Sequence, residues 1–227
     1  MGIAERRSEH LREELDFWRR WLTEESFRAA REPRLQPERP LAHWIRDLVD
    51  APEGAVVRIL DVGSGPLTTL GQIWPGRRID LTLTDPLAEE YNAVLAECGL
   101  GGVPRLLKAT GEEIDGVFPE AHFDFVHSAN ALDHAYDPLR CLQNMLRVSK
   151  PGAWIGVISV EDEGERQRYA GLHQWNFSVQ GDRLRLWNRE NDFFVDERLR
   201  GFDRLTVARV DHGTGLPIFQ AALRKAP

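Results

Sequence analysis

Cysteine is scarce in this chain of 227 residues, which contains two, Cys98 and Cys141. They lie far apart and have neither the close spacing of a zinc site nor the density of a disulfide-rich secreted domain. No other grouping of histidine, cysteine and acidic residues along the sequence is typical of metal ligands, so no metal is expected. We therefore expect a protein of a reducing compartment, the cytoplasm, whose fold depends on a hydrophobic core.

Long apolar runs and net positive charge are missing as well. No segment approaches the roughly 18 apolar residues of a membrane-spanning helix, and the charged N-terminus lacks the apolar centre of a secretory signal. There are 29 Lys and Arg against 36 Asp and Glu, a formal charge of −7. This balance argues against general binding to nucleic acid or to an anionic membrane. The 42% of hydrophobic residues is enough to build the core of one domain with small additions.

The first 50 residues predict two helices that precede any strand. Residues 9–29 carry leucine and tryptophan at helical spacing, and residues 41–49 repeat that spacing. Residues 31–40 contain three prolines and predict an extended connector. We interpret residues 1–50 as an N-terminal helical cap. Its tryptophans could wall a substrate pocket or pack against the sheet, and their spacing favours packing: Trp18, Trp21 and Trp44.

From residue 51 onward, short apolar runs alternate with helical patterns. The run at 56–62 is almost continuously apolar, as in a strand buried on both faces. Alternation of strands and helices predicts a parallel sheet with helices on both sides. The remaining strands are predicted at residues 80–84, 103–107, 123–128 and 153–160, and the helices from about Pro66, at 87–97 and at 139–148.

The last third of the chain changes character. After a polar helix at 161–168, residues 177–187 predict a hairpin that turns at Gln180-Gly181-Asp182. Two further strands, 205–210 and 218–223, are joined by a segment too short for a helical crossover, so they should be antiparallel. The predicted fold class is α/β: a Rossmann-like doubly wound seven-stranded sheet, mostly parallel, with an antiparallel last strand and an N-terminal helical cap.

The strongest motif is the turn that follows the first strand. Gly63 and Gly65 come directly after Asp61-Val62, where glycine lets the backbone turn sharply and approach a ligand closely. One βα unit later, the second strand ends at Asp85, whose carboxylate can accept hydrogen bonds from ribose hydroxyls. A glycine turn together with this acid is typical of a nucleoside site.

The details of this turn indicate which nucleoside it suits. A dinucleotide site needs a third glycine three residues after the second, to place a pyrophosphate at a helix N-terminus. That position is Thr68 here. Asp61 would also sit poorly beside a pyrophosphate, whereas it suits a cationic ligand with an amino group and a sulfonium.

With these motifs the sequence resembles the class I S-adenosylmethionine-dependent methyltransferases, from about residue 56 to residue 160. The acid-x-Gly-x-Gly turn at 61–65 and Asp85 carry the resemblance. Further pieces are similar to the family in order and spacing: Ala109-Thr110-Gly111-Glu112, the strand at 123–126 with its exit at 130–138, and Ser149-Lys150-Pro151-Gly152. Two departures are Leu67, where the family often has glycine, and Thr110, where it usually has aspartate.

The resemblance implies a cofactor, S-adenosylmethionine, and the residues that bind it. Gly63 and Gly65 would contact its methionine part, and Asp61 its amino group. Asp85 would bind the ribose, and the turn at 110–112 would meet the adenine. The predicted cofactor-binding residues are Asp61, Gly63, Ser64, Gly65, Asp85, Pro86, Thr110, Gly111, Glu112 and Asn130. Residues 51–227 would then form the methyltransferase domain, with a substrate-side insert near 161–200.

On the acceptor side, the candidate catalytic residues are His134, Asp133 and His173. A hydroxyl acceptor usually needs a base within hydrogen-bond reach, and an imidazole titrates near neutrality. The alternative, which the sequence favours, is that His134 only orders its loop together with Asp137. Trp175, Asn176 and Tyr169 are candidate substrate-binding residues, because polar and aromatic side chains there could stack a ring and bind its edge. The alternative places Trp175 in the core at a strand edge.

The predicted reaction is methyl transfer to an oxygen or nitrogen of a small polar metabolite or sugar-like acceptor, which leaves S-adenosylhomocysteine. The alternatives are a nicotinamide-dependent oxidoreductase and a non-catalytic binding protein that retains the fold. The expected partner is a small-molecule acceptor, and a homodimer is one option for the assembly.

Overall fold

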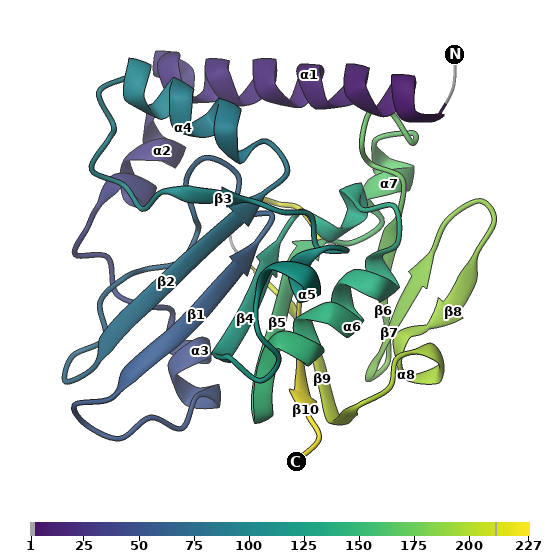
Figure 1. The fold of residues 1–227 in the computed structure, drawn as a ribbon. Helices are drawn as coiled ribbons and strands as arrows, with labels where there is room; N and C mark the ends of the chain where they lie inside the picture. Colours follow the sequence, from purple (N-terminus) through teal and green to yellow (C-terminus); the bar gives the residue numbers. More distant parts are fainter. Residues whose placement is uncertain (1–2, 212) are drawn as a thin grey trace.

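The computed structural model describes residues 3–211 and 213–227, which are built around a seven-stranded sheet (Figure 1). The order across it is β3-β2-β1-β4-β5-β10-β9. Its strands are β1 (Val56–Val62), β2 (Arg78–Asp85), β3 (Leu106–Lys108), β4 (Phe123–Ala129), β5 (Ser149–Val160), β9 (Phe202–Val210) and β10 (Ile218–Lys225). The predicted Rossmann-like fold is confirmed, including the antiparallel strand, because β10 runs antiparallel to both of its neighbours.

Chain order reverses at β1, which pairs in parallel with β2 on one side and β4 on the other. The connections leave the sheet there in opposite directions, so a crevice is expected beyond the carboxyl ends of these strands. In Figure 1, α1 (Ile3–Thr23) lies across the edge of the sheet toward which the arrows of β1, β2 and β4 point. The N-terminal helix thus covers the place where ligands of this architecture bind.

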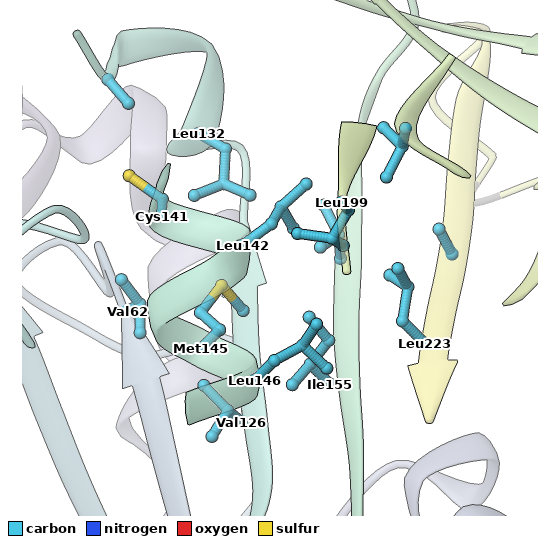
Figure 2. Packing of buried hydrophobic residues seen from close by; sticks show 14 of the residues in the cluster. Val62, Val126, Leu132, Cys141, Leu142, Met145, Leu146, Ile155, Leu199 and Leu223 are labelled. Atoms are coloured by element: carbon cyan, nitrogen blue, oxygen red, sulfur yellow. The ribbon is translucent and has the colours of Figure 1, made fainter. Parts of the chain in front are cut away.

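Both faces of the sheet are covered. On one face, the helix α6 (Pro138–Val148) packs Met145 and Leu146 near Val126 and Ile155, as Figure 2 shows. On the other face, Ile45 and its neighbours pack against Val57, Ile59 and Phe125. The remaining helical segments are η1 (Glu25–Phe27), α2 (Arg28–Leu35), α3 (His43–Leu48), α4 (Ala88–Glu97), α5 (Ile114–Val117), η2 (Leu132–His134), α7 (Glu163–Arg166) and α8 (Val195–Arg198).

The predicted hairpin at 177–187 is present but belongs to a second sheet. This sheet has the order β6-β7-β8 and consists of β6 (Asn176–Gln180), β7 (Arg183–Trp187) and β8 (Asp192–Phe194). Its apolar side chains, Phe177 and Leu184 among them, join the core that α6 shares with the main sheet. It follows that the insert near 161–200 packs on the body of the fold.

Two sequence predictions about local structure are wrong. Residues 31–40 are not wholly extended, because α2 continues to Leu35 with Pro33 inside it. Tertiary contacts outweigh the lost donor: the Arg31 guanidinium donates to the carbonyl oxygen of Trp21, and that of Arg34 to the carbonyl oxygen of Leu67.

The helix expected from Pro66 is absent from the segment between β1 and β2, which the structure describes throughout. The Thr68 hydroxyl donates to the Asp61 carboxylate and accepts from the backbone N–H of Leu70. Such side-chain bonds compete with helical backbone bonds.

None of the helices in residues 3–211 and 213–227 combines the length and apolarity needed to cross a membrane.

Candidate functional site

A cavity of about 520 Å³ opens at the carboxyl ends of β1, β2 and β4, beneath α1. This volume lies within the roughly 300–1,000 Å³ that small-molecule sites occupy. Every predicted cofactor-binding residue lines it: Asp61, Gly63, Ser64, Gly65, Asp85, Pro86, Thr110, Gly111, Glu112 and Asn130. The three candidate catalytic residues line it too, so the structure brings both predicted groups to one place.

The glycine turn forms the floor of the cavity. Gly63 and Gly65 have φ values of +67° and +61°, which side-chain-bearing residues rarely adopt. A Cβ atom on Gly63 would lie 2.4 Å from the Cβ of Ala131. The N–H groups of Gly63 and Ser64 both donate to the carbonyl oxygen of Thr84, at 2.8 and 3.1 Å. Glycine is therefore required here by backbone conformation and by close packing.

Asp85 ends β2 in a buried position at the cavity wall. Its Oδ2 accepts from the N–H of Gly65 at 3.1 Å, and its Oδ1 from the N–H of Leu87 at 2.9 Å. Burial raises the pKa of Asp85 to about 7; the two amides lower it, and the charges of Glu14 and Asp61 add to the rise. A carboxylate has about four acceptor positions, so two remain for ligand hydroxyls.

Asp61 is buried behind the glycine turn and has two partners in the protein. Its Oδ2 accepts from the Thr68 hydroxyl, and its Oδ1 lies 2.8 Å from Nδ1 of His127. His127 lies on the neighbouring strand β4 and is itself buried. These contacts fix the Asp61 carboxylate, which lines the cavity and adds negative charge there.

The predicted adenine-side residues are tied to the loop that enters α6. Oε1 of Glu112 accepts from the N–H groups of Tyr136 and Asp137 at 2.8 and 3.2 Å. A Cβ atom on Gly111 would lie 2.7 Å from Sγ of Cys141, so this position needs glycine for packing. Asn130 has a φ of +49°, and its Oδ1 accepts from the N–H of Val160. These residues shape the cavity wall through their own hydrogen bonds.

The candidate catalytic residues converge on one point. Nδ1 of His173 lies 2.7 Å from Oδ2 of Asp133 and 3.0 Å from Nε2 of His134. The backbone joins the two segments, because the N–H groups of Gln174 and Trp175 donate to the Asp133 carbonyl oxygen at 3.0 and 3.2 Å. Burial acts against both charged forms, but the attraction between the Asp133 carboxylate and the two imidazoles prevails. It lowers the pKa of Asp133, and its hydrogen bond to His173 raises the pKa of that imidazole.

This convergence corrects one expectation from the sequence. No metal-like grouping was visible, yet donor atoms of Asp133, His134 and His173 lie within 4.8 Å of one another. His173 is 39 residues from His134 and 40 from Asp133, so no spacing rule could have found the cluster. Their meeting depends on the long connection that follows β5.

The predicted substrate-binding residues do not reach the cavity, which is a second correction. Trp175 and Asn176 are buried in the protein, as the core alternative for Trp175 proposed. Oδ1 of Asn176 accepts from the N–H of Glu165, and its Nδ2 donates to the Tyr169 hydroxyl at 3.0 Å. Tyr169, Trp175 and Asn176 thus hold α7 against β6, and that end of the cavity is lined by Glu163, Gln167 and Leu172.

The first helix contributes side chains to the cavity: sequence reasoning missed Glu14 and named Trp18 and Trp21 only as a possible wall. Glu14, Trp18 and Trp21 line the cavity together with Arg34, whose guanidinium lies 5.1 Å from the Trp21 ring. Trp18 and Trp21 therefore pack in the apolar cluster beneath α1 and also line the cavity. Trp44 packs on Phe125 instead. Acidic side chains in the cavity lining exceed basic ones, of which Arg34 is the example, and this balance favours a cationic ligand. The acidic lining residues are Glu14, Asp61, Asp85, Glu112, Asp133 and Glu163.

Residues 60–157 match the family model of the methyltransferase domain. Over 104 residues, the chain is 29% identical to a protein of Oryza sativa subsp. japonica described as "Probable tocopherol O-methyltransferase, chloroplastic". That match covers 44% of this chain and 28% of the relative, so the chain spans little more than a quarter of the relative's length.

Two solved structures share the fold over nearly the whole chain. One is a Burkholderia thailandensis 1,6-didemethyltoxoflavin-N1-methyltransferase with bound S-adenosylhomocysteine; it is 18% identical with a TM-score of 0.54, covering 100% of this chain and 92% of that one. The other is a Thermotoga maritima S-adenosylmethionine-dependent methyltransferase, described as a "possible histamine N-methyltransferase". It is 18% identical with a TM-score of 0.51, covering 94% and 96%.

Proposed function

We propose that this chain, which carries a methyltransferase domain of the class I S-adenosylmethionine-dependent family, transfers the cofactor's methyl group to an oxygen or nitrogen of a small polar or sugar-like acceptor. The product is S-adenosylhomocysteine. Membership in this family confirms the resemblance that the motifs predicted and the cofactor that it implied. The reaction of the whole protein, its acceptor and its partners are our proposals.

The observation that carries the proposal is the cavity itself. It joins a glycine turn, the buried Asp85 carboxylate and an acidic lining on one side to a polar aspartate–histidine cluster on the other. S-adenosylmethionine has hydroxyls for Asp85 and positive charge for the acidic wall, so the residues fit it. When bound, it supplies an activated methyl group on a sulfonium.

The residues of the chain would then act mainly by positioning. Asp85 would accept hydrogen bonds from the ribose with its two remaining acceptor positions, while the Gly65 amide holds the carboxylate in place. Asp61, fixed by Thr68 and His127, would attract the amino group. Thr110, Gly111 and Glu112 would border the adenine, and Asn130 the methyl end. Alignment of donor and acceptor is the main catalytic requirement of such a displacement.

Asp133, His134 and His173 would face the acceptor. Their polar atoms lie at the end of the cavity that α7 and the following loop border, which favours a polar acceptor with oxygen or nitrogen atoms. The similar rice protein is named for methylation of an oxygen of tocopherol, and the Burkholderia structure for methylation of a nitrogen, so both acceptor atoms stay within the proposal. We also propose a cytoplasmic location and a small-molecule partner, with a homodimer as one option.

Isothermal titration calorimetry of the purified protein tests the proposal directly. S-adenosylmethionine and S-adenosylhomocysteine should both bind, and NAD should not. Binding of NAD alone would favour a nicotinamide-dependent oxidoreductase. Binding of the cofactor without methyl transfer to any of a panel of hydroxyl and amine acceptors would favour a non-catalytic binding protein.

The substitution Asp85→Ala should weaken S-adenosylhomocysteine binding by about 1–3 kcal/mol, because buried hydrogen bonds to a carboxylate are lost. The matched control is Asp80→Ala, which removes an exposed carboxylate from the same strand. Calorimetry should find the control equal to the wild type. Equal affinity in Asp85→Ala would contradict the assignment of the ribose to this residue.

A further inference from the structure

We propose that Asp133, His134 and His173 form a binding site for a divalent transition-metal ion at the acceptor end of the cavity. The proposal begins from the triangle of their donor atoms. The distances are 2.7 Å between Oδ2 of Asp133 and Nδ1 of His173, 3.0 Å between the two imidazole nitrogens, and 3.5 Å between Oδ2 of Asp133 and Nε2 of His134. Donor atoms held about 2.1 Å from one ion lie roughly 3.0–3.4 Å apart at octahedral or tetrahedral angles. The 3.0 and 3.5 Å distances lie in or close to this range, and the 2.7 Å contact between Asp133 and His173 would lengthen by a few tenths of an ångström on metal binding.

A cation satisfies this arrangement better than protons do. Nδ1 of His173 faces a carboxylate oxygen and an imidazole nitrogen at once, and a single proton on it can point at only one of them. An ion placed about 2.1 Å from each donor, a little out of the plane of the triangle, accepts electron pairs from all three atoms together. Glu14 on α1 and Glu163 on α7 line the same cavity as the triangle, so the surroundings favour positive charge.

A second observation is independent of the triangle. Asp133 is 2% exposed, and its other oxygen, Oδ1, is buried with no hydrogen-bond partner among the residues that the structure describes. A buried carboxylate oxygen without a partner is costly. Coordination of a cation by this carboxylate compensates for that cost.

The donor set indicates the class of metal. Two imidazole nitrogens and one carboxylate suit Zn²⁺, Fe²⁺, Mn²⁺ or Co²⁺, whereas Ca²⁺ and Mg²⁺ prefer oxygen ligands. Three protein ligands leave coordination positions open, as in sites where a metal meets a substrate. All three residues line the cavity, so the open positions would face the place of the acceptor.

The site would therefore select acceptors that present an oxygen or nitrogen able to coordinate a metal, such as neighbouring hydroxyl groups. This part rests on the proposed methyl transfer, whereas binding of the metal itself does not. The two can be tested apart, because S-adenosylhomocysteine binding and metal binding have separate readouts.

The experiment uses protein without a histidine tag, treated with a chelator and then dialysed. Co²⁺ is titrated while its visible absorption is recorded, and Zn²⁺ binding is measured by calorimetry. One ion should bind per chain. His134→Ala and His173→Gln should each weaken binding at least tenfold, because each removes one donor. Circular dichroism melting checks that both variants fold. Both substitutions lie at partly exposed positions, and the buried Asp133 is left unchanged because its replacement could unfold the protein.

The matched control is His43→Ala. His43 and Asp47 form an exposed pair on α3, with Nδ1 2.6 Å from Oδ2, and no third ligand accompanies them among the described residues. This variant should bind the metal as the wild type does. Absence of metal binding in wild-type protein, or equal binding in His134→Ala and His173→Gln, would overturn the metal site. If S-adenosylhomocysteine still binds in that case, the proposed function stands without it.

Discussion

At the scale of single residues, the buried carboxylate of Asp85 links ligand binding to stability. Its pKa is raised to about 7, mainly by burial, with Glu14 and Asp61 as negative neighbours and the Gly65 and Leu87 amides as donors. In the unfolded chain an aspartate titrates near 3.9. Between these values the folded protein holds the additional proton, so stability should fall as pH rises from about 4 to about 7, by on the order of 1 kcal/mol per pH unit from this group.

Asp85→Asn should remove that contribution. Urea unfolding at pH 5 and pH 8 should show a smaller loss of stability between the two pH values in Asp85→Asn than in the wild type. Asp80→Asn, an exposed change on the same strand, should keep the wild-type difference. Parallel behaviour of Asp85→Asn and the wild type would mean that the carboxylate is not the group responsible.

Gly63 offers a second test at this scale. Gly63→Ala should destabilise the protein by about 2–4 kcal/mol, because it adds strain at positive φ and a Cβ 2.4 Å from that of Ala131. Gly54→Ala is the matched control: φ is +82°, but a Cβ there meets nothing within 4 Å. Chemical denaturation should show a smaller loss for Gly54→Ala, and Ala131→Gly should rescue part of the loss in Gly63→Ala. Equal losses in both alanine variants would leave backbone strain as the sole cause.

At the scale of elements, α1 adds charge to the cavity as well as apolar cover. Glu14 lines the cavity, and its position is stabilised by the Trp18 indole, which donates to its Oε1 at 2.7 Å. Glu14→Gln should weaken binding of the cationic S-adenosylmethionine by about threefold to tenfold and affect the neutral-sulfur product less, since a partly buried charge contributes about 1 kcal/mol.

The comparison between the two ligands is what tests this role of α1. Glu13→Gln changes a neighbouring exposed acid on the same helix and should leave both affinities unchanged. Calorimetry with both ligands measures the difference. An equal loss for both ligands in Glu14→Gln would point to altered packing of α1 and against an electrostatic role.

At the scale of the whole molecule, the sequence predicts features formed by neighbouring residues, but it does not predict contacts between segments that lie far apart in the chain. The glycine turn and Asp85 follow directly from neighbouring residues, and the structure brings them to one cavity as expected. The approach of His173 to Asp133 depends on how the connection after β5 folds back, which no local pattern encodes. The same connection turns Trp175 and Asn176 away from the cavity.

Some local rules were also overruled by packing. Pro33 predicted an extended segment, yet α2 includes it because Arg31 and Arg34 attach this helix to its surroundings. The division into residues 1–50 and 51–227 stays a prediction. Trp21 and Leu22 share one apolar cluster with Leu83 and Tyr91, so the first helix is continuous with the packing of the main body.

The position of β10 has a consequence for synthesis of the protein. This strand follows every other strand in chain order, yet it lies between β5 and β9 and pairs with both. Until the ribosome has released residues 218–225, β5 presents an open edge and β9 has no neighbour to join. From the emergence of β5 until residues 218–225 have followed, the nascent chain is thus exposed to wrong strand pairing, and a chaperone that shields this edge would matter most in that interval.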